Sequence, residues 1–145
     1  MPGKVIWFYK KYTLYGKMIF LCKENFNMRV FYYLSTCQTC KRIIKDLYLN
    51  DSIQRIDIKK TPMNKDQLNY LYKIEGSYEN LINKRAKLFK TPGLRNKALE
   101  ENDYKKLLLE HYTFLKRPVL AYDNNLFIGN SSNVIIKMKK FLSEQ

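Results

Sequence analysis

The strongest chemical signal in this sequence is a pair of cysteines, Cys37 and Cys40, separated by Gln38 and Thr39. They stand where a run of β-branched and aromatic residues gives way to a helical pattern. The reactive form of cysteine is the thiolate, and the free amides and positive dipole end of a helix start stabilise it. A second thiol one turn further along can resolve a mixed disulfide formed by the first. We therefore predict thiol–disulfide chemistry, with Cys37 attacking and Cys40 resolving.

The cysteine pair could have two other roles. A C-x-x-C motif can supply half of a zinc site, and the remaining ligands would then be Cys22 and His111, which are far apart and irregularly spaced. Both cysteines can also serve as small buried hydrophobic residues. Their position at the end of a strand favours redox chemistry, so we expect no metal site. His111, the only histidine, is expected to be a packed helix-face residue rather than a general base.

The elements around the cysteines form a βαβ unit. Arg29–Leu34 is rich in β-branched and aromatic residues and predicts a buried strand. Gln38–Leu49 has the apolar stripe of a helix, and Ile53–Ile58 alternates like a strand. Two strands joined by a helix within about 30 residues are expected to be parallel, with a right-handed crossover.

The rest of the chain predicts a helical stretch followed by a hairpin and a last helix. Asn64 and Gln67 form a capping-box pattern that starts a helix ending before Gly76. The further expectations are a turn or short helix at Tyr78–Asn83, a helix at Glu101–Tyr112, strands at Val119–Tyr122 and Leu126–Ile128 joined through Asp123–Asn125, and a last helix capped by Ser132. This order predicts an α/β fold of thioredoxin-like type: a mixed four-stranded sheet with helices on both faces, and a helical insertion between the βαβ unit and the C-terminal ββα unit.

Residues 1–27 differ from the rest of the chain. Val5–Tyr9 and Tyr12–Cys22 could form two strands, turning around Lys10-Lys11 or around Gly16. Nothing downstream is an obvious pairing partner, and Met28 stands directly before a clean strand. We expect residues 1–27 to be an extension, either non-native or poorly ordered, and residues 28–145 to be the domain.

Composition narrows the functional class. Lys and Arg total 27 against 13 Asp and Glu, a net charge of +14, which attracts polyanions whatever the fold. Direct nucleic-acid binding is still not expected, because no Arg-rich stretch, zinc-finger spacing or aromatic RNA-binding motif is present. No apolar run exceeds five residues, so neither a membrane span nor an export signal is predicted. Three cysteines are too few for a disulfide scaffold. We therefore expect the protein to work in the reducing cytoplasm.

Three blocks of sequence resemble the arsenate reductase family of thioredoxin-like proteins, which also contains the Spx-type regulators. The blocks are Tyr33–Arg42, Leu81–Arg85 followed by Phe89-Lys90, and Phe114–Val119, and the tail Ile128–Asn130 fits as well. They are spread over the region from Met28 to the C-terminus. Each block is modest alone, but their order and spacing are fairly specific.

The resemblance implies roles for five residues. Cys37 corresponds to the family's nucleophile. Arg117 matches the arginine that faces this cysteine and binds an oxyanion or steadies the thiolate, and Pro118 matches the proline that is cis in thioredoxin-like folds. Arg85 matches an arginine of the insertion that reaches the site. Thr36, directly before Cys37, is expected to join Arg85, Arg117 and Pro118 around an anionic substrate.

The sequence also departs from the family pattern. Arsenate reductases linked to glutathione and glutaredoxin have a His-Asn-Pro run where this chain has Tyr33–Ser35. Their third anion-binding arginine falls near Gly129 or Asn130 here. Losing one charge-assisted contact costs about 1.5–3 kcal/mol, which weakens binding by about one to two powers of ten. Arsenate is therefore not the expected substrate. Cys40 is similar to the second cysteine of Spx-type proteins.

These observations predict a cytoplasmic thiol–disulfide oxidoreductase or thiol-dependent reductase. Cys37 attacks, and Cys40 or an external thiol such as glutathione resolves. The expected substrate is a small thiol or anionic compound, the expected electron donor is glutathione or a thioredoxin/glutaredoxin system, and no bound cofactor is expected. The alternative is an Spx-type redox regulator that binds a subunit of RNA polymerase. A third option is a protein that has lost both roles and only binds glutathione.

Overall fold

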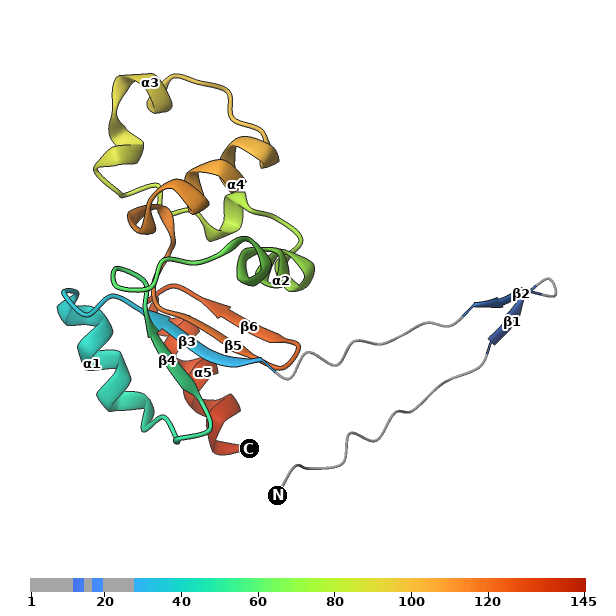
Figure 1. Cartoon of the computed structure of the whole chain (residues 1–145). Helices are drawn as coiled ribbons and strands as arrows, with labels where there is room; N and C mark the ends of the chain where they lie inside the picture. The colour runs from blue at the N-terminus through green and yellow to red at the C-terminus, as the bar shows by residue number, and fades with distance from the viewer. Residues whose placement is uncertain (1–11, 15–16, 20–27) are drawn as a thin grey trace.

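The computed structural model describes residues 12–14, 17–19 and 28–145 (Figure 1). In chain order, its elements are β1 (Tyr12–Leu14), β2 (Lys17–Ile19), β3 (Arg29–Tyr33), α1 (Gln38–Leu47), β4 (Gln54–Asp57), α2 (Lys65–Glu75), η1 (Glu79–Leu81), η2 (Leu88–Lys90), α3 (Pro92–Arg95), α4 (Glu101–Glu110), η3 (Tyr112–Phe114), β5 (Val119–Tyr122), β6 (Asn125–Ile128) and α5 (Ser132–Ser143). β1 and β2 pair with each other and flank the expected turn at Gly16. The expected strand at Val5–Tyr9 lies outside the described residues.

The main sheet has four strands in the order β4-β3-β5-β6. β3 and β4 are parallel, and the pairs β3–β5 and β5–β6 are antiparallel. This confirms the predicted βαβ unit and C-terminal hairpin. The hairpin turn is one residue shorter than expected, because Asn125 pairs with Tyr122 inside the ladder. Asp123 takes a left-handed φ of 51° in this turn, a conformation that Asp tolerates better than most residues.

Helices cover both faces of the sheet, as predicted, and each face has its own core. One core gathers buried residues of β3, β5, α1 and α5, including Phe31, Leu120 and Met138. The other gathers residues of the sheet, α2 and α4, including Leu71 and Leu107. In β5, successive side chains alternate between the two cores, as they must on a pleated strand. Figure 1 shows α1 and α5 on one side of the sheet and the insertion, with α2 and α4, on the other.

The helix ends follow local chemistry. Asn64 and Gln67 make the predicted reciprocal capping box, and Gly76 ends α2 with a φ of 80°. α1 ends at Leu47, two residues before the expected Leu49, because Tyr48 turns to a left-handed φ of 46°. α4 ends at Glu110, before the expected Tyr112, because the following residue has extended backbone angles.

The predicted cap of the last helix was wrong by one residue. The side chain of Ser131, not Ser132, accepts a hydrogen bond from the amide of Val134. Ser131 has an extended backbone, whereas Ser132 is already the first helical residue. A capping side chain must come from the non-helical residue to reach the amide three positions on. No helix in the described part of the chain is long and apolar enough to cross a membrane.

Candidate active site

Cys37 stands at the junction between β3 and α1, on a tight turn. Its amide donates to the carbonyl of Leu34 at 3.0 Å, and its own carbonyl accepts the amide of Lys41 at 3.1 Å. The residue has extended backbone angles, φ −92° and ψ 115°, and occupies the position before the first helical residue, Gln38. Its sulfur therefore lies at the end of α1 where backbone amides lack helical partners.

The surroundings of Cys37 favour its thiolate. Partial burial is the largest single influence and raises the pKa, but several groups together outweigh it. These are hydrogen bonds from the backbone amide and thiol of Cys40, one from the backbone amide of Thr39, and the charge of Arg117, so that the pKa of Cys37 is lowered. A partly exposed, stabilised thiolate is the usual form of a nucleophilic cysteine.

Cys40 has the opposite character. Its side chain is completely buried and packs in the core that faces α2 and α4. Burial raises the pKa of Cys40 to about 11, and the nearby Cys37 adds to the rise, against smaller opposing effects of the Leu34 backbone and Arg117. Both cysteines are free thiols. The motif therefore joins a partly exposed thiol of lowered pKa to a buried thiol of raised pKa.

Arg117 and Pro118 stand directly before β5, and the charge of Arg117 reaches both cysteines. The Arg117–Pro118 peptide bond is cis, as the resemblance implied, and Pro118 is fully buried. The Pro118 carbonyl accepts the amide of Gly129 at 2.8 Å, which ties the start of β5 to the end of β6. Arg117 is half-buried, and its charge lowers the pKa of both Cys37 and Cys40.

Arg117 also carries an unused donor. Its Nη1 atom is buried and has no hydrogen-bond partner among the described residues. A buried guanidinium nitrogen without an acceptor is costly to leave unpaired.

The structure does not bring Arg85 to the cysteines. Its side chain is exposed, and its backbone amide donates a hydrogen bond to Asn83 Oδ1 at 3.2 Å. In the described part of the chain, Arg117 is the arginine whose charge reaches Cys37. Thr36 is exposed on the turn directly before Cys37. Substrate binding by Arg85 and Thr36 stays a prediction.

Asp57 is a site residue that the sequence reasoning missed. It is the buried charged residue of the described chain, with 8% of its surface exposed. Its Oδ1 accepts the amide of Ser35 at 3.3 Å and that of Lys59 at 3.2 Å. The alternation of Ile53–Ile58 predicted that Asp57 lies on the same face of the strand as Arg55, which is exposed. The only sequence signal was a carboxylate directly between two isoleucines.

The metal alternative gains no support from the described residues. No group of three or more histidine, cysteine, aspartate or glutamate side chains there is arranged to hold a metal ion, and Cys22 lies outside them. His111 instead connects α4 to η3: its Nδ1 accepts the amide of Thr113 at 3.2 Å. Its ring stacks on Tyr112 with centroids 4.5 Å apart. These contacts are those of a packed residue.

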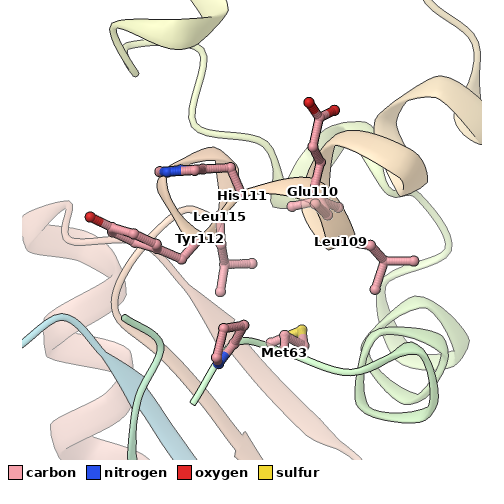
Figure 2. Close-up of a pocket in the computed structure, with 8 residues that line it drawn as sticks. Met63, Leu109, Glu110, His111, Tyr112 and Leu115 are labelled. Atoms are coloured by element: carbon pink, nitrogen blue, oxygen red, sulfur yellow. The ribbon is translucent and has the colours of Figure 1, made fainter. Parts of the chain in front are cut away.

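A small apolar pocket lies between the end of α4 and the loop that follows β4 (Figure 2). Its volume is about 210 Å³, and it is lined mainly by apolar side chains, among them Met63, Leu109 and Leu115. The cysteines do not line it.

Comparison with known proteins agrees with the site. The model of the family described as "ArsC family" matches residues 32–138, a span that includes both cysteines, Arg117 and Pro118. The chain belongs to the ArsC family. The predicted resemblance to arsenate reductases and Spx-type proteins is thereby confirmed.

Individual relatives come from both branches of this resemblance. A protein of Bacillus anthracis named "Global transcriptional regulator Spx 2" is 29% identical over 118 residues, covering 79% of this chain and 87% of the relative. A possible arsenate reductase from Streptococcus mutans is 25% identical, with a TM-score of 0.58 over 73% of this chain and 93% of the other. Arsenate reductase from Vibrio cholerae has a TM-score of 0.63 at 19% identity, covering 77% and 97%. These structures confirm the thioredoxin-like fold of the family.

Proposed function

We propose that this protein is a thiol–disulfide oxidoreductase in which Cys37 is the nucleophile and Cys40 the resolving thiol. The observation that supports it is the contrast within one helical turn. Cys37 is partly exposed with a lowered pKa, and Cys40 is buried with a raised pKa. A thiolate attacks readily near neutral pH, whereas a buried thiol stays protonated until its neighbour has reacted.

The proposed reaction consists of two exchanges. The Cys37 thiolate attacks one sulfur of a substrate disulfide, forms a mixed disulfide and expels the other substrate sulfur as a thiolate. Cys40 then loses its proton and attacks Cys37 Sγ, which forms the Cys37–Cys40 disulfide and expels the second substrate thiolate. The substrate gains two electrons and the protein loses two. Glutathione or a thioredoxin or glutaredoxin system returns them.

We further propose that Arg117, together with Arg85 and Thr36, favours small anionic substrates. The buried, unpaired Nη1 of Arg117 would donate to a carboxylate or other anion on the bound compound. No metal or organic cofactor takes part in this mechanism. The need for an external reductant fits the reducing cytoplasm, where we place the reaction.

Cysteine variants test the mechanism, in a Cys22→Ser background that removes the third thiol. C37S is expected to lose all turnover of a small disulfide such as hydroxyethyl disulfide with glutathione as reductant, while keeping its circular dichroism spectrum. C40S is expected to accumulate a mixed disulfide on Cys37, detected by intact mass. Undiminished turnover in C37S would exclude the mechanism. A mixed disulfide on Cys40 of C37S would exclude it as well.

The second candidate function is redox-controlled regulation of transcription through RNA polymerase. It is favoured by the relative named as an Spx regulator, which this chain covers over most of its length. In that case the Cys37–Cys40 disulfide would be a switch rather than an intermediate. Pull-down of polymerase subunits by reduced and by oxidised protein separates the two. Retention that depends on the disulfide, with slow turnover, favours the regulator.

A further inference from the structure

The buried carboxylate of Asp57 has no role in the mechanism above. Its Oδ2 atom is buried without a hydrogen-bond partner among the described residues. A buried carboxylate is costly to desolvate unless hydrogen bonds and nearby positive charge compensate that cost. The amides of Ser35 and Lys59 donate hydrogen bonds to the Asp57 carboxylate.

The parallel pairing of β3 and β4 brings Asp57 to the cysteine turn. Asp57 ends β4 opposite Tyr33, which ends β3, and the amide of Ile58 continues the pairing with the Tyr33 carbonyl at 2.9 Å. The carboxyl ends of the two strands thus lie at the same edge of the sheet. The segment that leaves β3 at this edge leads directly to Cys37.

The carboxylate connects the two segments that leave the sheet here. Oδ1 accepts the amide of Ser35, on the turn before Cys37, and that of Lys59, after β4. Burial raises the pKa of Asp57, but the Ser35 hydroxyl, the amides of Lys59 and Ser35 and the charge of Lys60 outweigh it, so its pKa is lowered. The side chain therefore stays ionised and is a strong acceptor for both amides.

We propose that Asp57 is a positioning residue for Cys37: by holding the Ser35 amide, it fixes the turn that presents the Cys37 sulfur to the first amides of α1. The turn is closed by the Cys37 amide on the Leu34 carbonyl, so Ser35 lies inside it. Without the carboxylate, this loop can rotate and move the sulfur away from the amides of Thr39 and Cys40. This inference rests on the proposed role of Cys37 as nucleophile.

The test measures the pKa of Cys37 from the pH dependence of its alkylation by iodoacetamide, read by mass spectrometry on the reduced full chain. Asp57→Leu keeps the branched shape of the side chain but removes the acceptor. It is expected to slow alkylation of Cys37 at pH 6.5 by about fivefold, since the thiolate fraction falls as the pKa rises. Asp57→Asn keeps one acceptor oxygen, and is expected to stay within about twofold of wild type.

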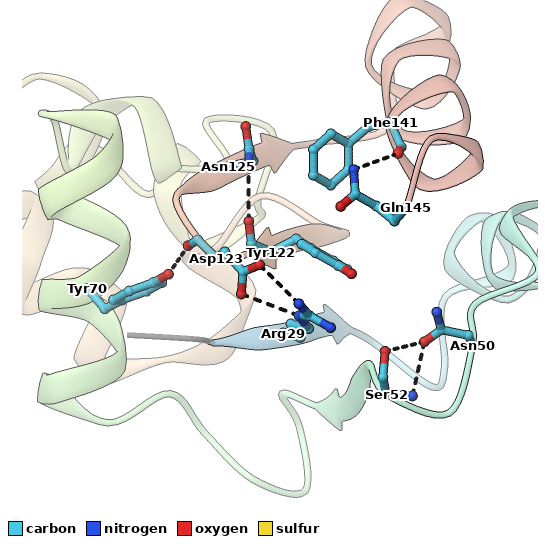
Figure 3. Close-up of polar contacts among 9 residues, drawn as sticks. All are labelled: Arg29, Asn50, Ser52, Tyr70, Tyr122, Asp123, Asn125, Phe141 and Gln145. Atoms are coloured by element: carbon cyan, nitrogen blue, oxygen red, sulfur yellow. Dashed lines mark hydrogen bonds and ion pairs between the residues drawn. The ribbon is translucent and has the colours of Figure 1, made fainter. Parts of the chain in front are cut away.

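A matched control comes from the other end of β4. Asn50 Oδ1 accepts the amide of Ser52 at 3.0 Å (Figure 3), a local turn of the same kind that does not lead to a cysteine. Asn50→Leu is expected to leave the pKa of Cys37 unchanged. If Asp57→Leu fails to fold, Asp57→Ser, whose hydroxyl is too short to hold both amides, is expected to show the same slower alkylation.

The outcomes separate the two proposals. A lowered wild-type pKa that Asp57→Leu leaves unchanged, with only a lower melting temperature, would overturn the positioning role and leave the proposed function intact. Equal effects of Asp57→Asn and Asp57→Leu would also overturn it, because the acceptor oxygen would then not matter. A wild-type Cys37 that titrates like free cysteine would overturn both.

Discussion

Two residues of the same type have opposite roles here because of what surrounds them. Cys37 meets free amides, a thiol and the charge of Arg117, whereas Cys40 is sealed in an apolar core. In the proposed mechanism, this difference divides the thiol chemistry into an attacking group and a resolving group. At the residue scale, the protein controls reactivity through burial and hydrogen bonding rather than through sequence alone.

The first prediction concerns the pH dependence of the two thiols. Alkylation of Cys37 is expected to reach its midpoint at a lower pH than that of an ordinary cysteine, because its pKa is lowered. Cys40 is expected to resist alkylation at neutral pH and to react only toward its pKa of about 11. Residue-resolved mass spectrometry after timed iodoacetamide pulses measures both. Equal profiles for the two cysteines would contradict the asymmetry.

The sign of the linked stability follows from the same shifts. The lowered pKa of Cys37 adds to the free energy of unfolding. This addition is present above the pKa of the cysteine in the unfolded chain, and it is lost as the pH falls through the pKa in the folded protein. The raised pKa of Cys40 gives a second addition, which is present below its unfolded pKa and lost as the pH rises to about 11. Urea denaturation of wild type is therefore expected to lose more stability between about pH 9 and 11 than that of Cys40→Ala.

Arg117 provides the second prediction. Arg117→Met removes the charge that stabilises the Cys37 thiolate but keeps most of the side-chain length, and is expected to raise the pKa of Cys37 by up to about 1. The matched control is Arg85→Met, because Arg85 is exposed and does not influence this pKa. An equal rise in both variants would mean that general surface charge, not the position of Arg117, controls the thiolate.

At the element scale, the start of α5 depends on a single capping side chain, which gives the third prediction. Ser131→Ala is expected to destabilise the protein by about 1 kcal/mol, because it removes the acceptor for the Val134 amide. Ser132→Ala, one residue further on and already helical, is expected to change stability by less than about 0.5 kcal/mol. Urea denaturation measures both. The reverse order would restore Ser132 as the cap.

The elements show what could be predicted from sequence. The βαβ unit, the capping box at Asn64 and the C-terminal hairpin follow from local patterns, since apolar period and capping chemistry act within a few residues. The C-terminal end of α1 was missed by two residues and the cap of α5 by one. The left-handed conformation that ends α1 at Tyr48 is rare for a tyrosine, so the residue type gave no signal for it.

The site was predictable to a different extent. Cys37, Cys40, Arg117 and Pro118 carried motif signals, and the structure brings them together. Asp57 carried almost none, because its importance depends on strand register: only the pairing of β3 with β4 places it against the Ser35 amide. Long-range contacts of this kind are not visible in a single sequence.

At the scale of the whole molecule, the sheet separates two hydrophobic cores, and different helices pack on each of them. One core joins α1 to α5, and the other joins the sheet to the helical insertion. The turn of the β5–β6 hairpin is hydrogen-bonded to β3 and to α2. Arg29 pairs with Asp123 through two hydrogen bonds of 3.3 Å, and the Tyr70 hydroxyl donates to the Asp123 carbonyl (Figure 3).

Cys40 belongs to α1 by sequence, but its side chain packs on the insertion side, whereas Ile43 and Leu47 of the same helix pack on the other. We therefore expect oxidation of this sulfur to disturb the core shared with α2 and α4 more than the core shared with α5. Hydrogen–deuterium exchange is expected to differ between dithiol and disulfide forms in residues 65–110 and to stay the same in residues 132–143. The redox state of Cys40 would thus change the insertion, at a distance from the sulfur and on a surface that another molecule can contact.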